Sequence, residues 1–319
     1  MIMMQKLQAL SALALLGGFV VAATFPSRTP GAAVQPNANT QRAGVLHDGV
    51  LTVSLEAQQS QWRIDGPNRP PMTIEAFSEF GKPPLRPGPL VRVPQGTEIR
   101  FSVRNLLAAP LTFIVPGAVH GGPDRPGAMD SVVIAPGATA QLTTRATMPG
   151  NYVYRGRTPG RIGAVLQMTG LLGGALVVDT AGAPARSTDR ILVIMATPDS
   201  VGAAILDTNK IFNLDLVHTV YTINGRSWPN TERIPATVGD SIHWRIINAS
   251  IVAHPMHLHG FYYRVDAFAG PLEGIYGSPS PGQMVVTQVM SGFSGMSMTW
   301  APDRPGTWQI GRASCRERV

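Results

Sequence analysis

The sequence carries one set of landmarks twice, in the same order. Gly96, Ile99 and Asn105 recur 143 residues later, and two Pro-Gly turns of the first half recur at similar intervals in the second. The matching residues are Gly239, Ile242 and Asn248, and the matching turns are Pro136-Gly137 with Pro281-Gly282 and Pro149-Gly150 with Pro305-Gly306. A repeat of this length indicates two copies of one domain. Chance is the alternative, because Gly and Pro are frequent in turns.

The segments between these turns have the pattern of short β-strands. In residues 98–104, Ile99, Phe101 and Val103 alternate with polar residues, which predicts a strand with one buried face. Further strands are predicted at 51–55, 91–93, 151–154 and 174–178. With 34 glycines and 28 prolines in 319 residues, the chain favours short strands joined by turns over long helices. We therefore predict an all-β fold of two domains.

The first residues have the features of a secretory signal. Lys6 precedes an apolar stretch from Leu7 to Val21, and small residues follow it. A retained membrane anchor is the alternative, but the stretch is shorter than the roughly 20 residues of a spanning helix. We expect an exported protein, periplasmic or secreted, with no membrane span after cleavage. The predicted division is a signal peptide (1–23), a flexible leader (24–44), a first domain (45–180), a linker (181–189), a second domain (190–308) and a non-native tail (309–319).

Charge and cysteine content argue against a nucleic-acid-binding protein and against a disulfide-stabilised one. The net charge of +7 comes almost entirely from arginines spread along the chain. The chain has no basic run interleaved with aromatic residues, the pattern that would indicate nucleic-acid binding. Cys315 is the single cysteine, so the chain has no disulfide framework.

Three of the seven histidines lie in the segment His254-Pro-Met-His-Leu-His-Gly260. Side chains alternate along a strand, so His257 and His259 are expected on one side, while His254 aims elsewhere. Imidazole is the commonest metal ligand and suits copper, zinc and iron. The segment therefore predicts a metal site made by His254, His257 and His259, with a histidine-rich surface turn as the alternative.

This segment resembles the His-Pro-x-His-x-His-Gly motif of the multicopper oxidases in their small, two-domain form. The resemblance spans about residues 50–308. Its other parts are Asn224-Gly225 with Pro229, Gly239-Asp240 through Arg245 to Asn248-Ala249-Ser250, Pro305-Gly306-Thr307-Trp308, Pro87 to Val93 with Gly96 and Asn105, and Gly170 to Val178. It implies two tandem cupredoxin-like Greek-key β-sandwich domains, the second incomplete at its C-terminus.

The resemblance also implies copper as the cofactor. In this family a type 1 copper takes electrons from a reductant, and a three-copper cluster reduces dioxygen to water. His254 would then bind type 1 copper, and His257 and His259 would bind the cluster. A type 1 site combines two imidazoles, a thiolate and a weak axial ligand. The implied partners are a small-molecule reductant or a redox partner protein, and the implied assembly is a homotrimer.

The first domain departs from this pattern. Ile114 and Pro116 stand where the family has its first pair of histidines, and Arg155 and Arg157 stand at the second pair. Arginine is always protonated and offers no lone pair to a metal, so half of the cluster ligands are missing. The two arginines either bind an anion or fill the vacated space, and we expect the latter. His120 is either a displaced ligand or, as we expect, a residue of a solvated turn.

The C-terminus departs from the pattern as well. The family continues with His-Cys-His two residues after the position of Trp308, whereas this chain runs from Gln309 to Val319 without a histidine. That tail resembles the translation of a common sequencing adapter. We expect it to be non-native and Cys315 not to be a copper ligand, with a divergent natural C-terminus as the alternative.

Together these observations favour an exported, copper-binding oxidoreductase of the multicopper oxidase type. Electrons would pass from a small reductant through a type 1 copper in the second domain, and complete reduction of dioxygen is not favoured. A non-catalytic copper-binding or copper-buffering module, or a structural cupredoxin, is the alternative. We expect no blue copper and no enzyme activity in the chain as written. His243, on the outward face of residues 241–247, is expected to be exposed to solvent.

Overall fold

The computed structural model describes residues 31–64, 70–116, 129–159, 172–183, 189–198, 219–270 and 279–312. Within these ranges every regular element is a β-strand, which confirms the all-β prediction. In chain order the strands are β1 (Gln35–Pro36), β2 (Val45–His47), β3 (Val50–Trp62), β4 (Met72–Glu79), β5 (Leu85–Arg86), β6 (Gly88–Pro94), β7 (Glu98–Asn105), β8 (Leu111–Pro116), β9 (Met129–Ile134), β10 (Thr139–Arg145), β11 (Gly150–Arg157), β12 (Leu172–Asp179), β13 (Arg190–Pro198), β14 (Thr219–Ile223), β15 (Ile242–Asn248), β16 (His254–Leu258), β17 (Tyr263–Ala269), β18 (Met284–Val285), β19 (Thr287–Met290), β20 (Gly295–Trp300) and β21 (Ile310–Arg312).

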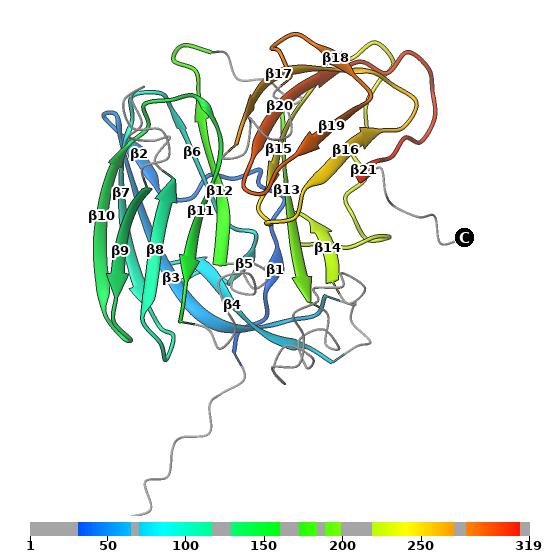
Figure 1. The fold of residues 1–319 in the computed structure, drawn as a ribbon. Coiled ribbons are helices and arrows are strands. Elements are labelled where there is room, and N and C mark those ends of the chain that lie inside the picture. The colour runs from blue at the N-terminus through cyan, green and yellow to red at the C-terminus, as the bar shows by residue number, and fades with distance from the viewer. Residues whose placement is uncertain are drawn as a thin grey trace, which may run out of the picture.

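The first half of the chain forms a sandwich of two sheets (Figure 1). One sheet has the order β1-β5-β4-β3-β7-β10, with β2 paired to β3, and the other has the order β6-β12-β11-β8-β9. Strand β7 presents Ile99 and Phe101, both fully buried, to the core between them, as the alternation predicted. Phe101 packs on Phe113 with ring centroids 5.1 Å apart, and the buried Tyr154 ring completes the cluster.

The second half repeats this plan with a smaller second sheet. The larger sheet has the order β14-β13-β15-β20-β17-β18, and the smaller one has the order β19-β16-β21. Their shared core contains Trp244, Met256, Tyr263 and Met298. The histidine segment is thus the central strand, β16, of a three-stranded sheet. This position holds its backbone by hydrogen bonds on both sides.

Two buried asparagines show that the halves are copies of one unit. The side-chain amides of Asn105 and Asn248 each donate to the carbonyl oxygen four residues later, at 2.8 Å in both cases. Each side-chain oxygen also accepts the N–H group two residues later, at 3.0 Å in both cases. Both asparagines end equivalent strands, β7 and β15. The repeat predicted from the sequence is confirmed at its most informative position.

An apolar cluster joins the two sandwiches. It draws on β6, β11 and β12 of the first half and on β13 and β15 of the second, with members Leu90, Val153, Ala175, Val177, Ile191, Val193, Met195, Ile247 and Ala249. Beside it, the Asn151 side chain donates to Ser297 Oγ at 2.8 Å. A Cβ atom added to Gly295 would overlap with the Asn151 carbonyl oxygen, so β11 and β20 approach each other closely. The two sandwiches therefore share a packed interior.

A network of ion pairs also links the two sandwiches. Arg92 on β6 forms two hydrogen bonds with Asp179, at 2.8 and 3.0 Å, and a third with Asp189, at 2.6 Å. Arg245 on β15 contacts both of these carboxylates, at 2.7 and 3.2 Å. Asp189 is almost fully buried and precedes β13, the first strand of the second sandwich. These ion pairs therefore connect the beginning of the second sandwich to the first.

The structure corrects the prediction of a flexible leader for residues 31–44. Strand β1 pairs with β5, Ala43 donates its N–H to the Leu90 carbonyl at 2.7 Å, and Asn39 donates to Asn224 Oδ1 at 2.9 Å. The composition of this segment is typical of a linker. Its backbone groups nevertheless find partners on strands that are distant in sequence, and such pairings leave no local signal.

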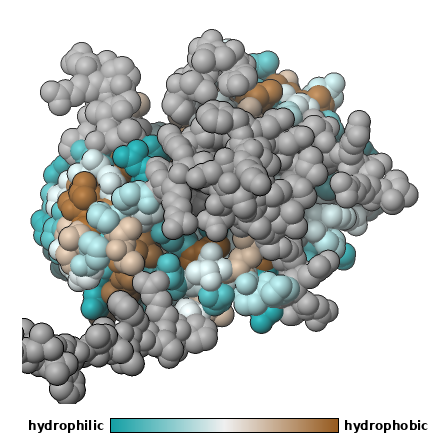
Figure 2. All heavy atoms as spheres, turned by 60° about the horizontal axis from the view of Figure 1, so that its bottom comes forward, coloured by the Kyte–Doolittle hydropathy of each residue, from teal (hydrophilic) through white to brown (hydrophobic). Residues whose placement is uncertain are grey.

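The described surface is mixed in character. On the face shown in Figure 2, apolar residues lie in small groups among polar ones. In the part of the chain that the structure describes, there is no helix long and apolar enough to span a bilayer.

Candidate metal centre

Strand β16 sorts the predicted ligands onto two faces. His254, Met256 and Leu258 are buried in the core of the second sandwich, while His257 is half-buried and His259, just past the strand, is exposed. The strand period of two produces this separation. The predicted orientation of the three histidines is therefore confirmed, with His254 pointing away from the other two.

His254 is enclosed by polar and aromatic neighbours. Its Nε2 atom lies 2.9 Å from Ser250 Oγ, and its ring meets the Tyr221 ring edge to face at a centroid distance of 5.2 Å. Asn248 holds Ser250 in the turn before β16. Met290 on β19 is the cross-strand partner of His254 and is fully buried. The ring is thus fixed within the core with a thioether side chain on the neighbouring strand.

His257 and His259 form a pair at the surface. Their ring centroids are 4.8 Å apart and the ring planes are nearly perpendicular, at 76°. His257 Nδ1 lies 2.7 Å from Thr287 Oγ1 on β19. The main-chain N–H of His259 donates to the Gln309 carbonyl at 2.9 Å. Two imidazoles at this separation can bind one ion, because metal–nitrogen bonds are about 2 Å long.

The neighbouring strand β21 offers this pair no further ligand. Gly311 is the cross-strand partner of His257, and Arg312 is the partner of Met256. A Cβ atom added to Gly311 would meet nothing within 4 Å, so the flank of His257 is open. The resemblance placed His-Cys-His at residues 311–313. The first two of these positions lie beside β16 but carry no ligand group, and Cys315 lies outside the described residues.

Within the ranges that the structure describes, no three His, Cys, Asp or Glu residues gather at a metal-binding distance. The described residues do not fit a blue copper site, because they include no thiolate to accompany His254. They do fit a two-imidazole site at His257 and His259.

Comparison with known proteins supports this architecture. Residues 203–310 match the sequence profile of the family described as multicopper oxidase. These residues are a multicopper oxidase domain. Over 224 residues, 67% of this chain, the sequence is 26% identical to a probable nitrite reductase-hydroxylamine oxidoreductase fusion protein of Kuenenia stuttgartiensis. The chain spans a quarter of that relative's length.

Solved structures show the same fold. A blue copper oxidase from Nitrosomonas europaea superimposes with a TM-score of 0.61 at 22% identity, covering 82% of this chain and 79% of that one. A copper nitrite reductase from Nitrosomonas europaea gives a TM-score of 0.59 at 18% identity, covering 84% and 90%. The prediction of tandem cupredoxin-like sandwiches is confirmed.

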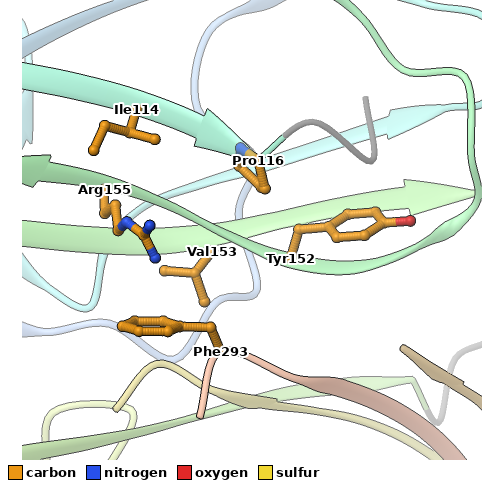
Figure 3. A pocket seen from close by; sticks show the side chains of 6 residues that line it. All are labelled: Ile114, Pro116, Tyr152, Val153, Arg155 and Phe293. Atoms are coloured by element: carbon orange, nitrogen blue, oxygen red, sulfur yellow. The ribbon is translucent and has the colours of Figure 1, made fainter. Parts of the chain in front are cut away.

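A small cavity lies where the first sandwich meets the multicopper oxidase domain, at positions where the resemblance expects histidines. Figure 3 shows Arg155 and Ile114 on its wall, with the Arg155 guanidinium over the Phe293 ring at 4.5 Å. Burial lowers the pKa of Arg155, and the nearby charge of Arg157 lowers it further. The cavity measures about 50 Å³, and its lining residues are Ile114, Pro116, Tyr152, Val153, Arg155 and Phe293. Apolar groups and one arginine occupy this place, and His120 lies outside the described residues.

Sequence reasoning missed two polar contacts in and around the multicopper oxidase domain. His243, expected at the solvated surface, is buried and contacts Asp189 at 2.8 Å. The outward face of β15 is covered by the joint between the sandwiches, which the pattern of a single strand cannot reveal. Thr287 was not singled out either. Only the pairing of β16 with β19 brings it to His257, thirty residues away.

Proposed function

We propose that this protein binds copper through His257 and His259 and is a multicopper-oxidase-like oxidoreductase that accepts electrons from a small reductant or a redox partner protein. The observation that carries the proposal is the perpendicular pair of imidazole rings, 4.8 Å apart, at the edge of a multicopper oxidase domain. We further propose that the protein is exported to the periplasm or secreted, as its N-terminal sequence predicts.

The donor set suits copper. Imidazole nitrogen binds Cu(II) well, and among divalent first-row metals copper binds such sites most tightly. Bound copper would supply one-electron redox chemistry. His257, tethered by Thr287, would give a fixed ligand, and the exposed His259 would give an adjustable one. The open flank at Gly311 leaves room for water or a small reductant.

Electron transfer through a type 1 copper in the second domain is a more demanding proposal. His254 would be its imidazole ligand, buried beside Met290 on the neighbouring strand. The described residues hold no thiolate that would complete such a site. We also propose that the protein assembles as a homotrimer, as the resemblance implies.

A non-catalytic copper-binding or copper-buffering module is the second candidate. The cavity lined by Ile114, Pro116 and Arg155 favours it, because the first sandwich has no imidazole at these positions. The names of the relatives, a blue copper oxidase and a copper nitrite reductase, support copper under either candidate. An assay for oxidation of a small reductant distinguishes the oxidoreductase from the buffering module, since a buffering module would bind copper without turnover.

Titration with Cu(II) tests the proposal. We expect one equivalent to bind the whole protein and His257→Ala or His259→Ala to weaken binding strongly. His47→Ala is the matched control, because the side chain of His47 is 84% exposed and lies in the first sandwich. We expect no intense blue absorption and an unchanged spectrum for Cys315→Ser. Equal binding by the wild type and His257→Ala would refute the site, and a blue band lost in Cys315→Ser would refute the exclusion of a thiolate.

A further inference from the structure

We propose that Thr287 is a positioning residue for copper binding, fixing His257 so that Nε2 is the ring nitrogen left for the metal. This inference rests on the proposed copper site, but part of its test does not require copper.

The contact is built into the sheet. His257 on β16 and Thr287 on β19 are direct cross-strand partners in an antiparallel pair. Side chains at such positions point to the same face and lie close together. The atoms Thr287 Oγ1 and His257 Nδ1 are 2.7 Å apart, a short hydrogen bond. Because both strands are held by the ladder, the hydroxyl is placed before any metal arrives.

The hydrogen bond decides which nitrogen can bind. A neutral imidazole carries one proton, and the partner of one ring nitrogen sets the state of the other. When Nδ1–H donates to Thr287, the lone pair of Nε2 is free for a metal. Ligating histidines generally donate their second N–H group to an acceptor, which fixes both tautomer and ring orientation. In our proposal the Thr287 hydroxyl, 2.7 Å from Nδ1, is that acceptor.

The two imidazoles are not equivalent. Across the residues that the structure describes, the exposed His259 ring has no hydrogen-bond partner, whereas the His257 ring is held at Nδ1. On the other side of His257, Gly311 contributes no side chain and leaves open space. Thr287 is therefore the one side chain identified as setting the direction of a ligand in this pair.

Paired variants of Thr287 test the inference. Thr287→Val keeps the shape of the side chain and removes the hydroxyl, and Thr287→Ser keeps the hydroxyl. Thr73→Val is the matched control, because Thr73 also lies on a strand and accepts a side-chain hydrogen bond, from Gln61 at 2.9 Å, in the other sandwich. Copper affinity is measured by competition titration. The tautomer of His257 in the metal-free protein is read from ¹⁵N shifts of the ring nitrogens, assigned with His257→Gln.

We expect Thr287→Val to lower the affinity for Cu(II) by about tenfold or more. Removing a residue that hydrogen-bonds a metal-ligating histidine typically costs about 10- to 100-fold in affinity. Thr287→Ser and Thr73→Val should retain the wild-type affinity. The metal-free wild type should show the Nδ1–H tautomer at His257, and Thr287→Val should lose it.

The failures are distinguishable. Copper binding that is unaffected by Thr287→Val, or an Nε2–H tautomer in the metal-free wild type, overturns the positioning role. A wild type that binds no copper overturns the proposed function. In that case the tautomer of the metal-free protein still tests the positioning of the His257 ring by Thr287: Nδ1–H supports it and Nε2–H contradicts it.

Discussion

The Nδ1 atom of His243 lies 2.8 Å from an oxygen of Asp189 inside the joint between the two sandwiches. The other ring nitrogen faces Asp266 at 3.7 Å. Asp189 also forms ion pairs with Arg92 of the first sandwich and Arg245 of the second. One carboxylate thus connects three basic side chains on two strands of different sandwiches.

We expect Asp189→Asn to destabilise the protein by about 3 kcal/mol, because removing one partner of a buried ion pair leaves the others without compensation. Urea unfolding followed by circular dichroism measures this change. Asp303→Asn is the control, since Asp303 pairs with Arg304 at the surface and its side chain is 69% exposed. That variant should stay within about 0.5 kcal/mol of the wild type. Equal effects of the two substitutions would contradict the role of Asp189.

Stability should fall in acid because of the same residue. Burial alone would raise the pKa of Asp189, but the hydrogen bond from His243 and the charges of Arg245 and Arg92 outweigh it and lower the pKa to about 2. The pKa in the unfolded chain is about 3.9. The stabilisation is therefore complete above about pH 4 and is lost as the pH falls towards 2. Melting temperatures between pH 5 and pH 2 should show this loss, and Asp189→Asn should flatten the profile over that window.

A third imidazole beside His257 should strengthen copper binding. Gly311→His would place its side chain on the same face as His257, in space where a Cβ atom meets nothing within 4 Å. We expect the dissociation constant for Cu(II) to fall about tenfold or more, equivalent to about 1.4 kcal/mol or more. Competition titration measures it, with Gly311→Ala as the control. A gain that persists in Gly311→His combined with His257→Ala would show that the new imidazole acts elsewhere.

The close approach of the sandwiches gives a prediction about packing. Gly295→Ala would force a methyl group against the backbone of Asn151, which cannot move without shifting β11. We expect a loss of about 1–3 kcal/mol of stability, typical of overpacking in a dense interior. Gly311→Ala, which adds the same methyl group in open space, should be nearly neutral. Chemical denaturation of both variants decides the matter, and equal stabilities would argue against a tight joint.

Local patterns in the sequence predicted much of the fold. Alternation at Ile99 and Phe101 identified β7, and the recurrence of Asn105 as Asn248 identified the duplication. The same rule of alternation placed His254 on the opposite face from His257. These successes share a cause, since each depends on a short local pattern or on the recurrence of such a pattern later in the chain.

The remainder depends on pairings between distant segments. The attachment of residues 31–44 requires strand β5, and the burial of His243 requires the first sandwich to cover β15. Thr287 reaches His257 only because β19 pairs with β16. None of these contacts leaves a periodic or compositional trace, so no reading of single segments could have found them.

The apolar cluster between the sandwiches, with Val153 on one side and Ile247 on the other, has an energetic consequence for metal binding. If the two halves unfold together, a ligand held by the second half protects the first half equally, by about 2.7 kcal/mol when its free concentration is a hundredfold above the dissociation constant. Hydrogen exchange at strand β7 would then slow as copper is added at β16. The first half, which has no imidazole where the resemblance expects ligands, would thereby report the occupancy of the site in the second half.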